Sequence, residues 1–302
     1  MRRVHCIAVT EPLIFDLLRA IREKGYEVSA SDEMLTDEMV AALRAAGCLF
    51  YPKGWNPNYL TKDIHYVVLG ATVRPDNPEL IRARELGLLI LSIPEFIFQQ
   101  TKDKMRVVVF GHTGKEIVLS MIVSALKRQK LAFDYALTDC IPELPDRVNF
   151  SYESRIALID GDEQPTLIFE KGRSTEFYRP HIAILANLTW GEGAPSLDVC
   201  RKFTASIERE GKLIYYDNDP IMTQLAAQVR DDITAMPYHN SEIVELEGAT
   251  CLQTRYGNYH VRILNADFPA LLNAARLACR QMGVKDTDFY QSLSDYSLSL
   301  QA

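Results

Sequence analysis

The stretch MRVVVFGHTGKE, residues 105–116, decides how the central part of this chain folds. An apolar run leads into two glycines and a lysine, and apolar residues then recur with helical spacing over residues 117–126. This order predicts a strand, a tight glycine turn and a helix. Backbone N–H groups at a helix N-terminus face an anion, glycines let it approach, and Lys115 adds a positive charge. The stretch therefore predicts a phosphate-binding loop at the start of a helix.

The residue after the lysine departs from this chemistry. A phosphate loop of this kind carries Ser or Thr there to hold Mg²⁺, and this chain has Glu116. A carboxylate is stabilised at a helix N-terminus, so Glu116 either fills the anion site itself or binds the metal directly. Two unit charges 4 Å apart interact by about 4 kcal/mol at an effective dielectric near 20. Facing a phosphate, Glu116 would therefore largely cancel the attraction of Lys115.

Length and composition limit the class of protein. The 302 residues are 47% hydrophobic and 24% charged, which fits a soluble protein of two domains. The net charge of −7 argues against nucleic acid or an anionic membrane as a partner. No apolar run approaches the length of a membrane span, and the N-terminus lacks the apolar region of a signal peptide. The six cysteines form no C-x-x-C pair and suit buried thiols, so we expect a cytoplasmic protein.

The first hundred residues alternate between strand and helix patterns. Strands are expected at residues 4–9, 26–30, 66–69 and 88–92, and helices at residues 13–24, 37–46 and 77–86. Such β-α-β alternation predicts an α/β fold with a Rossmann-like parallel sheet covered on both faces. The polar residues 99–104 mark the expected boundary between a first domain, 1–100, and a second, 101–302.

The second domain repeats the alternation and then changes. Strands are expected at residues 105–110, 156–160, 181–185 and 212–216, and helices at residues 115–127, 197–209 and 221–227. An antiparallel meander is expected over residues 242–247, 250–255 and 259–264, with turns at Gly248 and Gly257-Asn258. Helices over residues 268–282 and 286–293 close the chain. The pattern predicts a P-loop-like α/β domain with a small antiparallel extension.

Several segments together resemble the Mur ligase family. They are GYEVSASD (25–32), RPDNPE (74–79), PEF (94–96), residues 111–121, DGDE (160–163), YRPHIAILAN (178–187), KLIYY (212–216) and NAARLA (273–278). The resemblance implies ATP-dependent amide formation through an acyl phosphate on UDP-N-acetylmuramate. Such ligases have a UDP-sugar domain, a central ATPase domain and a C-terminal domain for the incoming amino acid or peptide. The chain resembles the first two, and we expect the third to be absent.

The resemblance also implies roles for individual residues. Lys115 is similar to the family's phosphate-binding lysine and is the candidate catalytic residue, because it would neutralise charge on the transferred phosphoryl group. The other candidate cofactor-binding residues are Gly111, His112, Thr113, Gly114, Glu116, Asn187 and Asp32. His112 and Thr113 are transposed relative to the family. Asp32 ends a strand and either meets a ribose or base edge or caps a helix.

Candidate metal ligands follow two later strands. Asp160 aligns with the family's metal-binding glutamate, and with Asp162 and Glu163 it would make a reasonable Mg²⁺ site or a plain acidic turn. Glu192 stands near the place of a family histidine and is the second candidate metal ligand. Tyr178 and His181 are expected to be structural.

Other departures from the family bear on activity. Thr10-Glu11-Pro12 replaces the glycine-rich turn that cradles the UDP pyrophosphate, and proline lacks the N–H that such a cradle needs. Residues 267–270, DFPA, replace a Gly-x-His-Asn segment. We therefore weigh two hypotheses: a catalytically degenerate binding or regulatory module, self-associating or paired with another subunit, and an active ligase that uses ATP and Mg²⁺. Asn77-Pro78-Glu79 is by its own chemistry a helix start.

Overall fold

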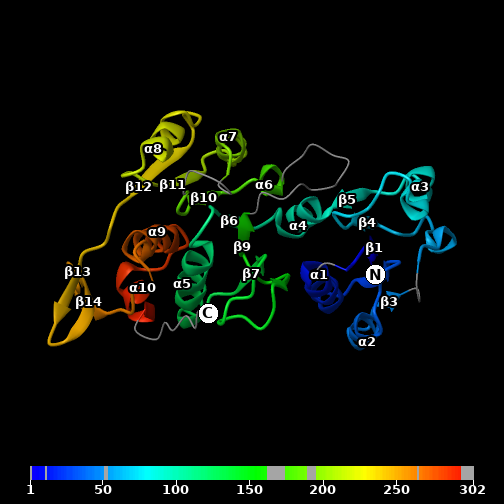
Figure 1. Ribbon diagram of the computed structural model, residues 1–302, viewed down its shortest axis with the longest axis horizontal. Coiled ribbons are helices and arrows are strands. Elements are labelled where there is room, and N and C mark those ends of the chain that lie inside the picture. The colour runs from blue at the N-terminus through cyan, green and yellow to red at the C-terminus, as the bar shows by residue number, and fades with distance from the viewer. Residues whose placement is uncertain are drawn as a thin grey trace.

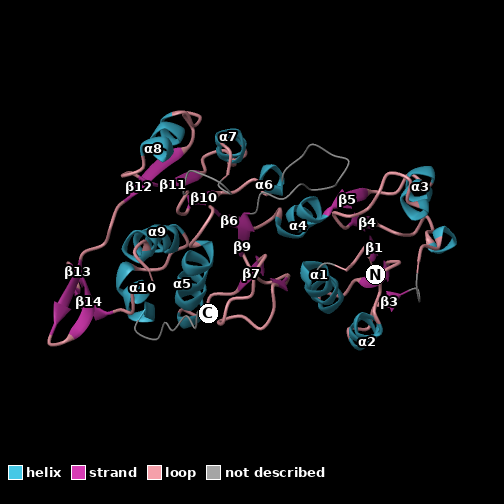
Figure 2. Cartoon of the chain, viewed as in Figure 1, coloured by secondary structure: helices cyan, strands magenta, loops and turns pink. Residues whose placement is uncertain are grey.

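The computed structural model describes residues 2–10, 12–50, 54–161, 174–188, 195–263 and 265–293. A five-stranded sheet lies at one end of the molecule and a small antiparallel sheet at the other (Figure 1). A seven-stranded sheet and its helices lie between them. The α/β class predicted from the sequence is confirmed, with a Rossmann-like sheet, a second α/β unit and an antiparallel extension (Figure 2).

The N-terminal sheet has the strand order β3-β2-β1-β4-β5 with parallel pairing, which is the order of a Rossmann half-fold. Its strands are β1 (Arg3–Ile7), β2 (Glu27–Ser31), β3 (Leu49–Phe50), β4 (Tyr66–Leu69) and β5 (Ile90–Ser92). Its helices are α1 (Pro12–Glu23), α2 (Asp37–Ala45), α3 (Pro78–Glu85) and α4 (Ile93–Thr101), with a 3₁₀ turn η1 (Pro57–Tyr59). The predicted start of α3 is confirmed, because the Asn77 side chain accepts hydrogen bonds from Glu79 N and Leu80 N.

The larger sheet has the order β12-β11-β10-β6-β9-β7-β8, and its edge strand β8 runs antiparallel to β7. Its strands are β6 (Met105–Phe110), β7 (Phe133–Ala136), β8 (Val148–Asn149), β9 (Ile156–Gly161), β10 (Ile182–Leu185), β11 (Lys212–Tyr216) and β12 (Thr234–Tyr238). The helices of this unit are α5 (Lys115–Arg128), α6 (Ser174–Phe177), α7 (Leu197–Ala205), α8 (Pro220–Ala227), α9 (Phe268–Gln281) and α10 (Asp286–Leu293).

Alternation along β6 divides the core into two layers. Val107 and Val109 pack with residues of α5, α9 and α10 on one face of the sheet. Val108 and Phe110 pack with residues of α7 and α8 on the other, and Phe110 stacks on Phe203 with ring centroids 4.8 Å apart. Both faces of the central strand are thus buried, which explains the unbroken apolar run in its sequence.

The polar stretch 99–104 was predicted to be a bridge between domains. Its first three residues instead form the last turn of α4, and Gln100, Thr101 and Lys104 are buried. Lys104 lies 2.7 Å from Asp134 on β7, so the polar residues pair inside the protein rather than in solvent. The division of the chain at residue 100 stays a prediction.

The antiparallel sheet consists of β13 (Ile243–Leu246), β14 (Ala249–Thr254) and β15 (Gly257–His260). The predicted turn at Gly248 is confirmed, with Glu247 and Gly248 between the strands. The second turn was predicted two residues too late: Arg255 and Tyr256 form it, and Gly257 already pairs with Thr254. Within the described residues, no helix is long and apolar enough to cross a lipid bilayer.

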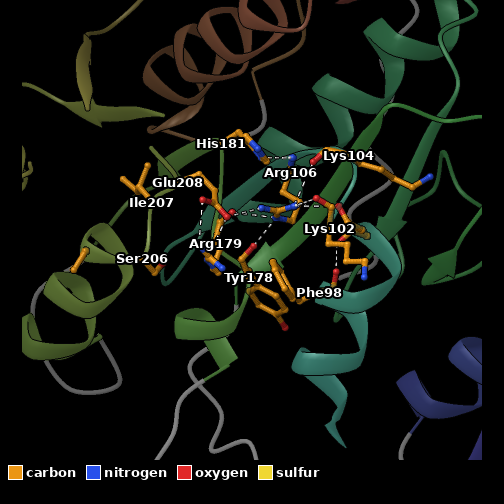
Figure 3. A network of polar contacts seen from close by, with 12 residues as sticks. Phe98, Lys102, Lys104, Arg106, Tyr178, Arg179, His181, Ser206, Ile207 and Glu208 are labelled. Carbon is orange, nitrogen blue, oxygen red and sulfur yellow. Dashed lines mark hydrogen bonds and ion pairs between the residues drawn. The ribbon is translucent and has the colours of Figure 1, made fainter. Parts of the chain in front are cut away.

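A buried arginine at the amino end of the central strand joins several elements (Figure 3). The Arg106 guanidinium lies 4.9 Å from the ring centroid of Phe98 on α4. It donates to six groups: the carbonyl oxygens of Thr101 (3.1 Å), Lys102 (3.0 Å), Lys104 (3.4 Å), Tyr178 (2.9 Å) and Arg179 (3.0 Å), and Glu208 Oε1 (3.0 Å). Arg106 therefore ties α4 to the entrance of β10 and to the segment after α7.

His181 belongs to the same network, and its role is structural, as predicted. Its Nδ1 accepts from Arg106 N at 3.2 Å, an arrangement that needs an unprotonated Nδ1. Burial, together with the nearby positive charge of Arg106, lowers the pKa of His181.

This lowered pKa gives a testable pH dependence. As the pH falls, the unfolded chain binds a proton at His181 near about pH 6.5, whereas the folded chain binds it only at a lower pH. The free energy of unfolding should therefore decrease as the pH falls below that value. His181→Asn keeps an acceptor near Arg106 N without a titrating group, so urea unfolding between pH 5 and 7 should show a shallower pH slope. The exposed His112→Asn is the control, and equal slopes in the two variants would contradict the assignment.

Candidate phosphate loop and N-terminal cleft

The predicted phosphate loop lies where parallel α/β sheets bind ligands, at the carboxyl ends of the strands. Residues 111–114 connect β6 to α5. The ends of β9 and β10 flank β6 on either side. The structure thus brings three residues to the same edge of the sheet: Lys115 at the start of α5, Asp160 on β9 and Asn187 shortly after β10.

The two glycines of the loop are fixed by packing. A Cβ on Gly111 would lie 2.1 Å from the carbonyl oxygen of Ala186 at the end of β10. Gly114 has φ +80°, and a Cβ there would lie 2.6 Å from Leu271 Cδ1 of α9. The predicted strand, glycine turn and helix are confirmed. The close approach of the Ala186 backbone explains why residue 111 is a glycine, and the contact with α9 explains why residue 114 is one.

The candidate catalytic lysine is paired inside the protein. Lys115 Nζ lies 2.7 Å from Asp160 Oδ1 and also donates to the carbonyl oxygen of Gly161 at 3.3 Å. Asp160 is buried, and the Lys115 side chain is largely so. Since each charge neutralises the other, the ion pair reduces both the pull of Lys115 on a phosphate and that of Asp160 on a metal ion.

Asn187 links the loop to an acid that the sequence analysis did not select. Its Nδ2 donates to Thr113 Oγ1 at 2.9 Å and to Asp267 Oδ2 at 2.6 Å. The backbone N–H of His112 donates to the carbonyl oxygen of Asn187 at 3.3 Å. Asp267 directly precedes α9, in the segment already noted as a departure from the Mur ligase pattern, and that departure was the available signal.

Acidic side chains gather around the loop. Glu116 lies in the first turn of α5, at the end where anions would bind. Together with Asp160 and Asp267 it outweighs Lys115, the lysine of the loop. Within the part of the chain that the structure describes, no three His, Cys, Asp or Glu side chains are grouped as a metal site. Glu192, Asp162 and Glu163 lie outside the described residues.

Asp32 lies in the other sheet, away from the phosphate loop. Its Oδ2 accepts from Val9 N at 2.7 Å and Thr10 N at 3.2 Å, and its Oδ1 accepts from Met34 N at 2.8 Å. The alternative that Asp32 caps a helix is wrong, because Thr36 caps α2. The carboxylate occupies N–H groups of the turn after β1, where the Mur ligase pattern places the pyrophosphate cradle.

A cleft of about 480 Å³ opens beside Asp32 at the carboxyl edge of the N-terminal sheet. Arg74 is the one Lys or Arg among its lining residues, and Trp55 offers an aromatic surface. Its other lining residues are Ala8, Thr10, Asp32, Glu33, Met34, Thr72, Val73, Asp76, Asn77 and Pro78. Such a cleft, with one aromatic face, one cation and several acceptors, suits a small polar ligand with a planar ring.

Comparison with known proteins identifies relatives of the whole chain. No family model matches the chain. The UDP-N-acetylmuramate–L-alanine ligase of Streptomyces griseus is 24% identical over 319 aligned residues, which cover 98% of this chain and 66% of that protein. The corresponding ligase of Carboxydothermus hydrogenoformans is 34% identical over 129 residues, covering 43% of this chain and 27% of that protein. Over nearly its whole length the chain is similar to a Mur ligase.

Solved structures of Mur ligases share the fold. The UDP-N-acetylmuramate:L-alanyl-γ-D-glutamyl-meso-diaminopimelate ligase from Neisseria meningitides superposes with a TM-score of 0.81 at 18% identity, covering 98% of both chains. The murein peptide ligase of Psychrobacter arcticus gives a TM-score of 0.79 at 16% identity, covering 99% of this chain and 69% of that one. The chain spans two thirds or less of the two L-alanine ligases and has the fold of the solved Mur ligases.

Proposed function

We propose that this chain is a Mur-ligase-related protein of peptidoglycan metabolism that binds a UDP-sugar-type ligand and does not turn over ATP. It would act as a binding or regulatory module. The observation that carries the proposal is the Lys115–Asp160 ion pair, 2.7 Å long, beside Glu116 at the start of α5. A loop that supplies its own carboxylates has little attraction left for a triphosphate.

An active ligase is the second candidate. The names of its relatives favour it, since both L-alanine ligases in the comparison act on UDP-N-acetylmuramate by name. In that case the chain would join UDP-N-acetylmuramate to an amino acid or peptide. Acid ligands outside the described residues, Glu192 among them, would then have to hold the metal.

Isothermal titration separates the two candidates. We expect heat of binding for UDP-N-acetylmuramate, none for ATP with Mg²⁺, and no phosphate release when both are present with L-alanine. Arg74→Ala should weaken the UDP-sugar about tenfold by removing a charge-assisted contact. The exposed Arg84→Ala on α3, outside the cleft, should leave the affinity unchanged.

Two outcomes would contradict the proposal. Micromolar ATP binding with phosphate release on adding UDP-N-acetylmuramate and L-alanine would establish the active ligase. Failure of UDP-N-acetylmuramate to bind would exclude the cleft as its site.

A further inference from the structure

Glu79, near the start of α3, is a fully buried carboxylate that neither candidate function uses. Burying a charge is costly unless hydrogen bonds compensate for the lost water. Glu79 Oε1 accepts from Asn56 N at 2.7 Å, and Oε2 accepts from Ser31 Oγ and lies 3.3 Å from His5 Nε2. Four segments of the N-terminal unit therefore meet at one carboxylate: β1, the end of β2, the loop before η1, and α3.

The carboxylate is held in its ionised form. Burial acts to raise the pKa of Glu79, but His5, Ser31 and the Asn56 N–H together outweigh it, and the pKa is lower than usual. His5 is in turn held by Ser29 Oγ, 2.8 Å from its Nδ1. An ionised acceptor makes the stronger kind of hydrogen bond, so the three partners are firmly fixed.

Two partners of Glu79, and Glu79 itself, are next to residues that line the N-terminal cleft. Ser31 precedes Asp32, Asn56 follows Trp55, and Glu79 itself follows Pro78. Asp32 and Trp55 come from different segments, which are also joined by a backbone hydrogen bond from Gly54 N to the carbonyl oxygen of Asp32 at 3.0 Å. Glu79 is bonded to the neighbours of both.

We propose that Glu79 is the positioning residue of the N-terminal cleft, which fixes Trp55 and Asp32 relative to each other and so sets the affinity for the ligand. The proposal rests on the proposed function only in taking that ligand to be a uridine nucleotide. Glu79 itself makes no contact with the ligand, because it is fully buried. Removing the Glu79 carboxylate should both loosen the loop that carries Trp55 and weaken ligand binding.

Trp55 provides a readout that a purely stabilising role would not change. The chain has two tryptophans, so Trp190→Phe leaves Trp55 as the only one. In this background, Glu79→Ala should increase acrylamide quenching of Trp55 in the folded protein and weaken the binding of UDP, the probe, about tenfold. Glu85→Ala is the matched control, since Glu85 lies on the same helix with its side chain 58% exposed. It should change neither quantity.

Conservative variants keep the test decisive if Glu79→Ala does not fold. Glu79→Gln retains an oxygen for Asn56 N but offers no anion to Ser31 and His5. It should therefore preserve the protection of Trp55 and give a UDP affinity between those of the parent and Glu79→Ala. Where Glu79→Ala cannot be measured, Glu79→Gln should still bind UDP more weakly than Glu85→Gln.

The possible results separate the two proposals. Unchanged Trp55 quenching in folded Glu79→Ala would overturn the positioning role, and so would a Glu79→Gln variant with the UDP affinity of Glu85→Gln. If the parent protein does not bind UDP, the nucleotide assignment of the cleft fails. The quenching comparison then still decides whether Glu79 holds Trp55.

Discussion

Replacing Arg106 with alanine is expected to destabilise the protein by about 3–5 kcal/mol, the usual cost of breaking a buried ion pair by removing one partner. The variant would remove the 3.0 Å partner of Glu208, which would keep the more exposed Arg179 at 3.2 Å. It would also take a donor away from the carbonyl oxygens of Lys102, which follows α4, and Arg179, which precedes β10. Burial lowers the pKa of Arg106, more strongly than Glu208 raises it, which reflects how far the guanidinium is removed from water.

Urea unfolding of Arg106→Ala measures the effect. Arg82→Ala is the matched control, because Arg82 also forms an ion pair, with Glu85 at 3.1 Å, but both side chains are exposed. Such a surface pair contributes at most about 1 kcal/mol. Arg106→Lys keeps the charge and loses the forked donors, so its stability should lie between those of the parent and Arg106→Ala. Similar losses in Arg106→Ala and Arg82→Ala would refute the view that this network joins the elements around it.

Replacing Glu116 with threonine is expected to strengthen the binding of ATP with Mg²⁺ about a hundredfold. The change removes a carboxylate from the first turn of α5 and supplies the hydroxyl that such loops use toward the metal. The expected gain in ATP affinity is smaller than the full repulsion between a buried carboxylate and a phosphate would give. Glu116 is only half-buried, and Lys115 remains paired with Asp160.

Isothermal titration of Glu116→Thr with ATP and Mg²⁺ provides the measurement. Glu153→Thr, which removes an exposed acid outside the loop, is the control for net charge. If Glu116→Thr binds ATP no better than Glu153→Thr, Glu116 is not what blocks the loop. Asp160, the partner of Lys115, would then be the residue to change next.

Elements with strong local patterns were predictable from the sequence. Strands β4 and β11 and helix α10 have the predicted bounds, because short apolar runs or helical spacing end at clear polar boundaries. Strands β7 and β12 were missed. Asp134 interrupts β7, and its charge is met by Lys104, which lies thirty residues earlier in the chain. Pro237 obscures β12, which tolerates proline because it lies at a sheet edge.

The site was predictable only in part, for the same reason. The sequence located the glycine loop, Lys115 and Asp160. It left Asp160 open between a metal ligand and an acidic turn, because local spacing does not reveal that β6 and β9 are neighbours. Asp267 and Glu79 were missed because their partners, Asn187 and the segments around Ser31 and Asn56, lie far away in the chain. Long-range pairing, rather than residue type, decides the roles of these acids.

Gly111 crosses the backbone of Ala186 so closely that any side chain would collide with it. This requirement arises from the route of the main chain and persists whether or not a nucleotide ever enters. Selection for folding alone can therefore keep the glycine signature after the polar residues beside it have changed. Gly111 by itself therefore reports the route of the main chain and carries no information about hydrolysis.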